Sequence, residues 1–314
     1  MTLFFYGANT YALRKQLGQM MNAYRAKAGS DYGLERVDGA TVKPRDLSAT
    51  LQASPFLATS RLVIVEGLAT NKSLGDKLAG ILAAVPDTTV AVFVDREVDQ
   101  RTTTFRTLSK ADKVMKFEPL SGPRLLGWVK GQIEAMGGSA DNAAIRELVD
   151  MAGEDQWRLE GEVNKLVNYD SKVTVETVRE LVAPSVERSI FDLVEAMASG
   201  RTAPALSGYH ALLKQKESEI YILTMVQWQL RNLLLAKTAP NMSPAELAKA
   251  AGMSPYVAGK MMAAQSNTDE ETLKGAYAAA ADCEYDIKSG RIKAEAAVEQ
   301  LIYRVSDSVS SRQH

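Results

Sequence analysis

The fold class follows from residues 3–11, Leu3-Phe4-Phe5-Tyr6-Gly7-Ala8-Asn9-Thr10-Tyr11. An apolar, strand-like run passes here through one glycine into residues 11–28, which carry apolar side chains at helical spacing. A P-loop at such a turn needs G-x-x-x-x-G-K-[ST], because its glycines let backbone N–H groups close on the phosphates, while the lysine and hydroxyl serve the γ-phosphate and Mg²⁺. Gly7 is instead followed by Ala, Asn, Thr and Tyr. The turn therefore predicts a nucleotide-binding frame that does not hold ATP.

Strands and helices alternate through the first third of the chain. Short β-branched or aromatic runs predict strands at residues 3–6, 34–37, 61–65, 89–94 and 113–117. Stretches of helical period lie between them, at residues 11–28, 44–53, 72–85 and 102–109. Such alternation predicts an α/β domain, a mostly parallel sheet with flanking helices, over residues 1–118.

The remainder of the chain is helical in period, and no strong strand signal returns. Residues 119–183 predict a small helical lid domain, in which Thr174 is the N-cap of the last helix. Because Thr177 rather than Glu follows three positions on, only half of a capping box is expected. Ala183-Pro184-Ser185 breaks the chain, and residues 184–314 predict a second all-helical domain rich in Ala, Met and Leu.

Composition indicates an ordinary globular protein. The hydrophobic and charged fractions are 46% and 24%, and no apolar run approaches the ~20 residues of a membrane span. The N-terminus has no secretory signal pattern, and Cys283 is the single cysteine, so we expect a cytoplasmic protein without disulfides. Residues 1–116 hold 16 Lys and Arg against 11 Asp and Glu, which favours an acidic partner, although chance surface variation explains the excess equally well.

The sequence contains no set of residues that indicates a catalytic site. His210, the single internal histidine, lies in an apolar helical stretch and is expected to pack or to face solvent. Asp95, Glu97 and Asp99 follow a strand and could bind Mg²⁺, but without a P-loop lysine we expect a solvated, helix-capping loop. The three tryptophans are expected in cores rather than stacked on bases: Trp128, Trp157 and Trp228. No active site, cofactor or metal is predicted.

Residues 54–60, Ser54-Pro55-Phe56-Leu57-Ala58-Thr59-Ser60, form an unusual connection between a helix and a strand. Connections normally run over the surface and carry polar residues, whereas Phe56 and Leu57 are large and apolar. Such a pair lowers solubility unless a partner covers it. A loop tucked into the core is the alternative.

The whole chain resembles the delta subunit family of the bacterial DNA polymerase III clamp loader. The resemblance rests on Phe5-Tyr6-Gly7 without a P-loop, on residues 54–63, and on a series of further segments. These are Asp99-Gln100-Arg101-Thr102, Phe117-Glu118-Pro119-Leu120, Trp128-Val129, Leu159-Glu160-Gly161-Glu162-Val163-Asn164-Lys165-Leu166, Ile190-Phe191-Asp192-Leu193, Gln229-Leu230-Arg231-Asn232-Leu233-Leu234 and Asp286-Ile287-Lys288-Ser289-Gly290.

The resemblance implies two N-terminal domains of AAA+ type, degenerate for ATP, and a helical collar that joins a pentamer. It implies that the chain binds the ring-shaped sliding clamp (the beta subunit) and opens it for loading onto primed DNA. The gamma/tau subunits would bind and hydrolyse ATP, and delta-prime and primer–template DNA would complete the assembly at replication forks. Carried onto this sequence, the clamp-binding element is Phe56 and Leu57, flanked by Ser54 and Pro55. Ser54 stands where some relatives have another apolar anchor.

Three other functions compete with this one. An active AAA+ ATPase is disfavoured by the turn after Tyr6. A sequence-specific DNA-binding module would need a compact basic recognition helix or an arginine-rich arm, and the sequence has neither. A different ATP-independent AAA+-like scaffold, or a DNA-binding subunit of another replication or repair assembly, stays open as the alternative.

Overall fold

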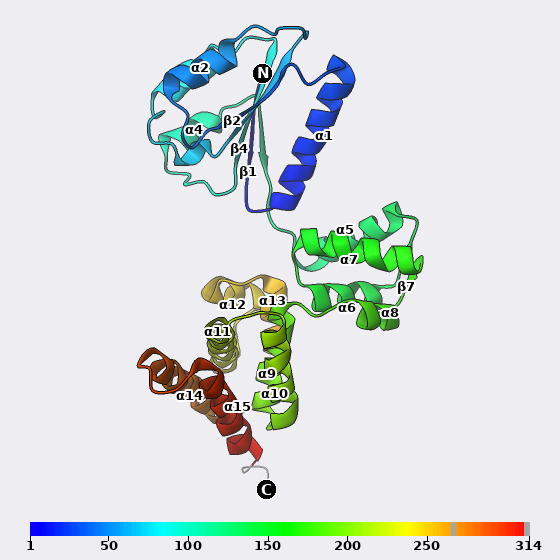
Figure 1. The fold of residues 1–314 in the computed structure, drawn as a ribbon, viewed down its shortest axis with the longest axis vertical. Helices are drawn as coiled ribbons and strands as arrows, with labels where there is room; N and C mark the ends of the chain where they lie inside the picture. The colour runs from blue at the N-terminus through cyan, green and yellow to red at the C-terminus, as the bar shows by residue number, and fades with distance from the viewer. Residues whose placement is uncertain (265–267, 311–314) are drawn as a thin grey trace. The chain divides into compact units, whose positions relative to one another are not determined.

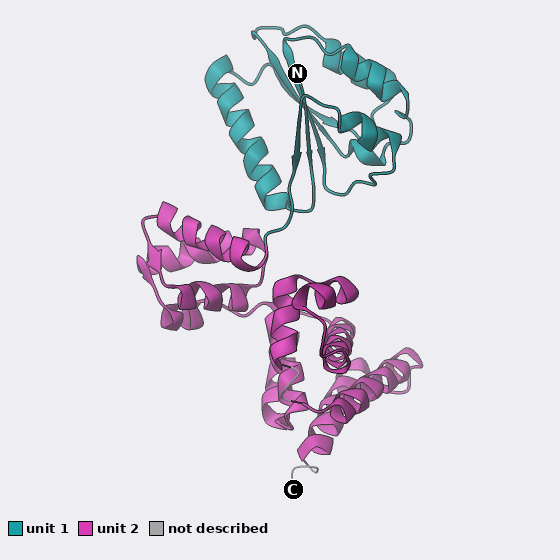
Figure 2. Cartoon of the chain, turned by 180° about the vertical axis from the view of Figure 1, so that it is seen from behind, with its two compact units in different colours: residues 1–120 teal, residues 121–314 magenta. Residues whose placement is uncertain are grey.

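The computed structural model describes residues 1–264 and 268–310, which form two compact units, residues 1–120 and 121–314 (Figure 2). The predicted division of the second unit at residue 183 stays a prediction. Among the described residues, no helix is both long and apolar enough to cross a membrane.

A five-stranded sheet forms the centre of the first unit (Figure 1). Its strand order is β2-β3-β4-β1-β5, and every neighbouring pair is parallel. The strands are β1 (Thr2–Tyr6), β2 (Leu34–Asp38), β3 (Arg61–Glu66), β4 (Thr89–Asp95) and β5 (Lys113–Lys116). The predicted parallel α/β domain is confirmed, with all five strands at the predicted positions to within one residue at either end.

Helices cover both faces of this sheet. The helix α1 (Thr10–Ala28) lies alone on one face, as Figure 1 shows, and packs on Leu3, Phe5, Ile64 and Val92. The opposite face carries α2 (Pro44–Gln52), the 3-10 helix η1 (Leu68–Thr70), α3 (Lys77–Ala83) and α4 (Thr103–Leu108). The alternating inward positions of each strand thus fill two separate apolar clusters within residues 1–120.

The second unit is almost entirely helical. Its first part contains α5 (Gly122–Ala135), α6 (Asn142–Ala152), α7 (Gln156–Tyr169) and α8 (Val175–Leu181). One expectation was wrong: residues Ser139–Ala140 and Lys172–Val173 pair as two short parallel strands, β6 and β7. Two-residue strands carry no periodic signal, so the sequence pattern could not reveal them.

The prediction of only half a capping box at the N-terminus of α8 was also wrong. The Thr174 side chain accepts from the N–H of Thr177, and the Thr177 hydroxyl accepts from the N–H of Thr174, at 3.3 and 2.9 Å. The capping box is therefore complete, because a threonine hydroxyl here performs the reciprocal step that Glu or Gln usually performs.

In the described part of residues 184–314 there are seven helices: α9 (Val186–Ala198), α10 (Thr202–Lys214), α11 (Glu219–Thr238), α12 (Pro244–Ala251), α13 (Pro255–Ala264), α14 (Glu270–Lys288) and α15 (Ala294–Ser310). Leu, Val, Ala and Ile side chains of α9, α10, α11, α14 and α15 share one buried cluster, whose largest member is Tyr209. The predicted helical C-terminal region is thus confirmed for the residues that the structure describes.

Candidate functional site

The connection between α2 and β3, residues 53–60, presents its apolar pair to solvent. The helix α2 ends at Gln52, and Ala53 and Ser54 precede Pro55, which disfavours helical backbone in the residue before it. The side chains of Phe56 and Leu57 are 78% and 69% exposed. The tucked-in alternative is therefore wrong for both residues.

Leu57 also has an unusual backbone. Its φ is +56°, in the left-handed region that non-glycine residues rarely adopt. Such a conformation costs an aliphatic residue about 1 kcal/mol or more and persists where the surroundings impose it. An exposed leucine in a strained turn has no role in the core, so its position favours a role in binding.

Two side chains hold the ends of this connection in place. The guanidinium of Arg61, which is largely buried at the start of β3, donates to the carbonyls of Thr50 and Ala53 at the end of α2, the latter at 3.1 Å. It also pairs with Glu35 on β2. At the other end, the hydroxyl of Tyr24 donates to the Ser60 carbonyl at 2.9 Å. The tip with Phe56 and Leu57 is therefore held between fixed ends.

Tyr32 adds a third exposed apolar side chain at the same edge of the sheet, and the sequence reasoning missed it. It is 74% exposed and lies in the turn that enters β2, the strand next to β3. The two connections touch, since a Cβ added to Gly33 would lie 2.6 Å from the Ser60 carbonyl oxygen. A large aromatic residue in the Asp31-Tyr32-Gly33 turn was the available signal.

The turn from β1 to α1 directs its backbone donors into the protein. The N–H of Gly7 donates to the Asp95 carbonyl at 3.1 Å, and that of Asn9 to the Phe117 carbonyl at 3.0 Å. A Cβ at Gly7, whose φ is +130°, would lie 2.2 Å from the same Phe117 oxygen. The Asn9 side chain accepts from the N–H of Ala12, at 2.9 Å. The N–H groups of Gly7, Asn9 and Ala12 thus all have acceptors within the chain.

The acidic cluster after β4 differs from its prediction. Asp95 is buried rather than solvated, and one carboxylate oxygen accepts from the N–H of Ala69 in η1 at 2.9 Å. Burial raises the pKa of Asp95 to about 6, against a smaller lowering by that hydrogen bond. Asp99 is exposed, and hydrogen bonds from Arg101 lower its pKa to about 2. Within residues 1–264 and 268–310, no three acidic, His or Cys side chains are arranged to hold a metal.

The remaining sequence candidates are not brought together. His210 lies on the surface of α10, 3.4 Å from the carboxylate of Glu299, in line with the expected placement. Trp228 packs against the large helical cluster, whereas Trp157 is exposed, so the core expectation was wrong for that residue. A helical period locates the apolar face of α7 but does not say how far a neighbour covers its first turn.

Comparison with known proteins gives consistent results. Residues 187–305 match the model of the C-terminal domain of the DNA polymerase III delta subunit. The chain is 22% identical over 302 residues to the DNA polymerase III subunit delta of Bacillus subtilis, covering 91% of this chain and 87% of that protein. The solved structure of the Bacillus subtilis DNA clamp loader delta protein (YqeN) has the same fold. It aligns with a TM-score of 0.68 at 21% identity, covering 98% of this chain and 95% of that one. Together these findings show that the chain is similar to DNA polymerase III delta subunits over most of its length.

Proposed function

We propose that the chain binds the sliding clamp, the beta subunit, through residues 53–60 and opens its ring for loading onto primed DNA. The observation that carries this proposal is the exposure of Phe56 and Leu57 between two tethered ends. Similarity to DNA polymerase III delta subunits supports a place in a clamp loader. Ser54 and Pro55 shape the approach to the pair, and Tyr32 extends the apolar surface on the neighbouring connection.

The geometry favours an anchor that binds without first having to become ordered. Large apolar side chains that fill a partner's pocket dominate the energy of most protein interfaces. Ordering a loop on binding costs free energy, and the hydrogen bonds of Arg61 and Tyr24 remove much of that cost in advance. A fixed anchor can also transmit force, so movement of the first unit would pull on one side of the clamp interface.

The chain itself is proposed not to bind ATP. Its β1–α1 turn lacks the lysine, the hydroxyl and the further glycines of a P-loop, and its N–H groups of Gly7 and Asn9 have acceptors inside the protein. Calorimetry with ATP and Mg²⁺ is expected to detect no Mg²⁺-dependent stoichiometric site tighter than about 100 μM, within the range of about 1 μM to 1 mM common for substrates. A tighter site of this kind would contradict the proposal.

The other partners follow from the same assignment. The gamma/tau and delta-prime subunits would associate with the helical region of residues 184–314, and gamma/tau would supply ATP hydrolysis. Primer–template DNA would meet the chain within that assembly, in the cytoplasm at replication forks. No catalytic residues are proposed.

The decisive experiment replaces Phe56 and Leu57 together by alanine. Buried anchors commonly lose about 2 kcal/mol or more each, so clamp binding should weaken by about 3 to 6 kcal/mol. Because both side chains are exposed in the free protein, the melting temperature should hardly change. Affinity for the clamp of the same organism and thermal melting are measured on the same preparation.

A matched control removes an exposed apolar side chain far along the chain, Ile220→Ala on α11. It should leave binary clamp binding intact. Tyr32→Ala should weaken clamp binding by less than the double variant. The proposal is wrong if the double variant binds the clamp as tightly as the unaltered chain, or if the loss is matched by Ile220→Ala.

A further inference from the structure

The face of the sheet that α1 covers changes from apolar to charged residues at the carboxyl ends of its strands. Along β3, the positions that face α1 run Leu62, Ile64 and then Glu66. Along β4, the paired positions run through Val94 and then to Arg96, just past the strand. Successive residues of one face thus pass from the apolar core to charged groups at the edge where ligands of open α/β sheets usually bind.

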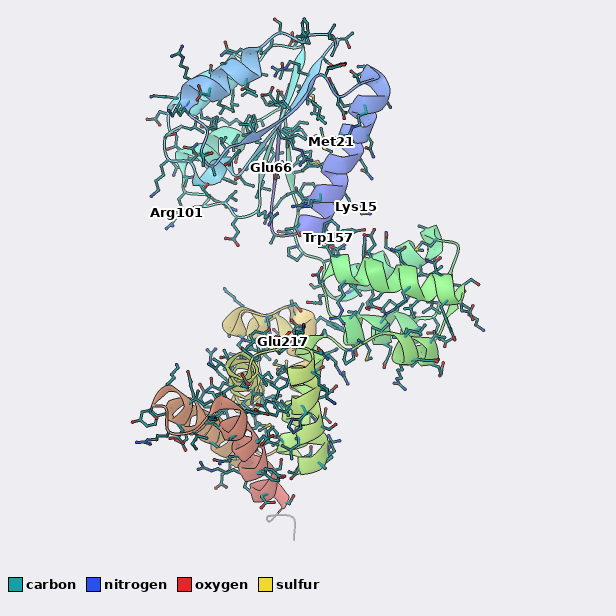
Figure 3. All side chains as sticks on the ribbon, in the orientation of Figure 1. Lys15, Met21, Glu66, Arg101, Trp157 and Glu217 are labelled. Carbon is teal, nitrogen blue, oxygen red and sulfur yellow. The ribbon has the colours of Figure 1, made fainter. Side chains whose placement is uncertain are left out.

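A cavity of about 170 Å³ lies at this edge, between α1 and the sheet. Figure 3 labels Met21 on α1 and Glu66 at the end of β3, which mark its two sides. One wall is the α1 stripe that includes Arg14 and Gly18, and Arg36 of β2 closes another side. Gly18 leaves room here, because an added Cβ would meet no atom within 4 Å.

The charge in this cavity is not balanced. Three guanidinium groups line it, those of Arg14, Arg36 and Arg96, and Glu66 is the one carboxylate in the lining. Arg36 is held loosely, with 3.8 Å between its nitrogen and the Glu66 oxygen and a contact to the Met21 sulfur. Neither Arg14 nor Arg96 has an ion pair or a side-chain hydrogen bond with any residue that the structure describes.

A larger cavity in the second unit has a more balanced set of charged side chains. It measures about 500 Å³ and is lined by three Lys or Arg and four Asp or Glu side chains. Among these, Lys260 pairs with Asp150, and the hydroxyl of Tyr256 donates to the same carboxylate. Lys260 thus has a carboxylate partner within this cavity, whereas Arg14 and Arg96 have none among the described residues.

We propose that the arginine pocket, defined by Arg14, Arg36, Arg96 and Gly18, binds a phosphate group. A guanidinium presents a planar fork of donors that matches phosphate oxygens, and several forks around one site can meet more than one oxygen. A cavity of about 170 Å³ has room for a phosphate group with some water but not for a folded segment. The ligand is therefore a phosphodiester of nucleic acid or a free polyphosphate.

This site is separate from the proposed clamp contact. Phe56 and Leu57 precede β3, at the amino end of that strand, whereas Glu66 ends it. The β1–α1 turn is not involved either, since the pocket uses side chains and not the N–H groups of Gly7 and Asn9. Failure of either proposal leaves the other standing.

The test uses the full chain and its variant Arg14→Gln/Arg96→Gln. Both side chains are exposed, so folding should be retained, and thermal melting verifies it. Binding of labelled single-stranded and duplex DNA is measured by fluorescence anisotropy between about 50 and 200 mM salt, and binding of pyrophosphate by calorimetry. The double variant should bind at least about tenfold more weakly, and the slope of log K against log salt should fall by about 1 to 2 for DNA.

Two further variants test whether binding depends on the pocket itself or on positive surface charge in general. Arg45→Gln removes an exposed cation on α2, across the sheet, and should leave binding unchanged. Gly18→Leu fills the cavity without altering charge and improves helix propensity, so it should weaken binding in a stable protein.

The outcomes distinguish the two phosphate sources. If the double variant weakens DNA binding and pyrophosphate does not bind, the ligand is a nucleic-acid phosphodiester. If the double variant weakens pyrophosphate binding and DNA does not bind, the ligand is a free polyphosphate. Weak ATP binding that needs no Mg²⁺ and that Arg14→Gln/Arg96→Gln abolishes belongs to this pocket and not to the β1–α1 turn. The proposal is overturned if neither ligand binds, if the variants bind as the unaltered chain does, or if polyglutamate competes as well as DNA, which would indicate an acidic protein segment.

Discussion

At the scale of single residues, Leu57 combines an exposed apolar side chain with a positive φ. Folding alone disfavours both features, because the side chain gains no burial and the backbone is strained. Natural proteins keep such residues where function needs them, at a cost to stability. Leu57 therefore offers a direct comparison of stability with binding.

Replacing Leu57 by asparagine should separate the effect of this residue on stability from its effect on clamp binding. Asparagine tolerates the left-handed region better, so the free energy of unfolding should rise by up to about 1 kcal/mol. Clamp binding should weaken by about 2 kcal/mol, since the anchor is lost. Denaturant unfolding and clamp affinity measure the two effects, and Leu57→Met, which keeps an apolar side chain with the same strain, is the control. If Leu57→Asn retained full clamp affinity, only Phe56 would remain as an anchor.

At the scale of elements, Asp95 ties the end of β4 to η1 through the N–H of Ala69. Its second carboxylate oxygen is buried and has no hydrogen-bond partner among the described residues. Asp95 is the last residue of an apolar strand, where an ATPase would place an acid beside Mg²⁺. Here the carboxyl group serves a structural contact, and its ionised form is disfavoured by burial.

This predicts a pH dependence of stability. The folded chain holds the Asp95 proton up to pH about 6, whereas the unfolded chain releases it near 3.8. The folded state therefore binds more protons between these values, and its stability falls as pH rises through them, by about 3 kcal/mol in total. Asp95→Asn cannot titrate and should lack this decline.

Unfolding by denaturant at pH 4, 5, 6 and 7 would compare the two proteins. The stability of the unaltered chain relative to Asp95→Asn should fall across the series, whereas Asp87→Asn, on an exposed turn, should run parallel to the unaltered chain. Parallel pH profiles for Asp95→Asn and the unaltered chain would show that the burial of Asp95 has no energetic consequence.

At the scale of the whole molecule, the two units divide the proposed tasks. Both apolar clusters that hold the sheet lie within residues 1–120, and a separate large cluster joins α9, α10, α11, α14 and α15. A unit with its own core can fold alone. The residues proposed to bind the clamp all belong to the first unit, and those proposed for assembly to the second.

Separating the units should therefore separate the activities. Residues 1–120 expressed alone should fold cooperatively and bind the clamp with nearly unchanged affinity, but should not co-elute with the gamma/tau and delta-prime subunits. Size-exclusion chromatography with each partner tests this, and the Phe56→Ala/Leu57→Ala form of the same fragment is the control. Co-elution of residues 1–120 with gamma/tau would place part of the assembly surface in the first unit.

Sequence alone determined the main helices and strands of this protein, the order of its α/β and helical regions, and the lack of a P-loop at Gly7. Helices and strands follow from apolar periodicity and capping residues within a few positions, and a missing lysine is visible without any fold. The resemblance to delta subunits also indicated Phe56 and Leu57. These features depend on residues that are close in the chain.

Only the tertiary structure decided which of these residues are exposed, buried or brought together. It places Phe56 and Leu57 in solvent, brings Tyr24 and Arg61 to the two ends of their connection, and buries Asp95. It also gathers three arginines from α1, β2 and the end of β4 around one cavity. The reason is physical: burial and charge convergence arise from packing between segments far apart in sequence, and no local pattern contains that information.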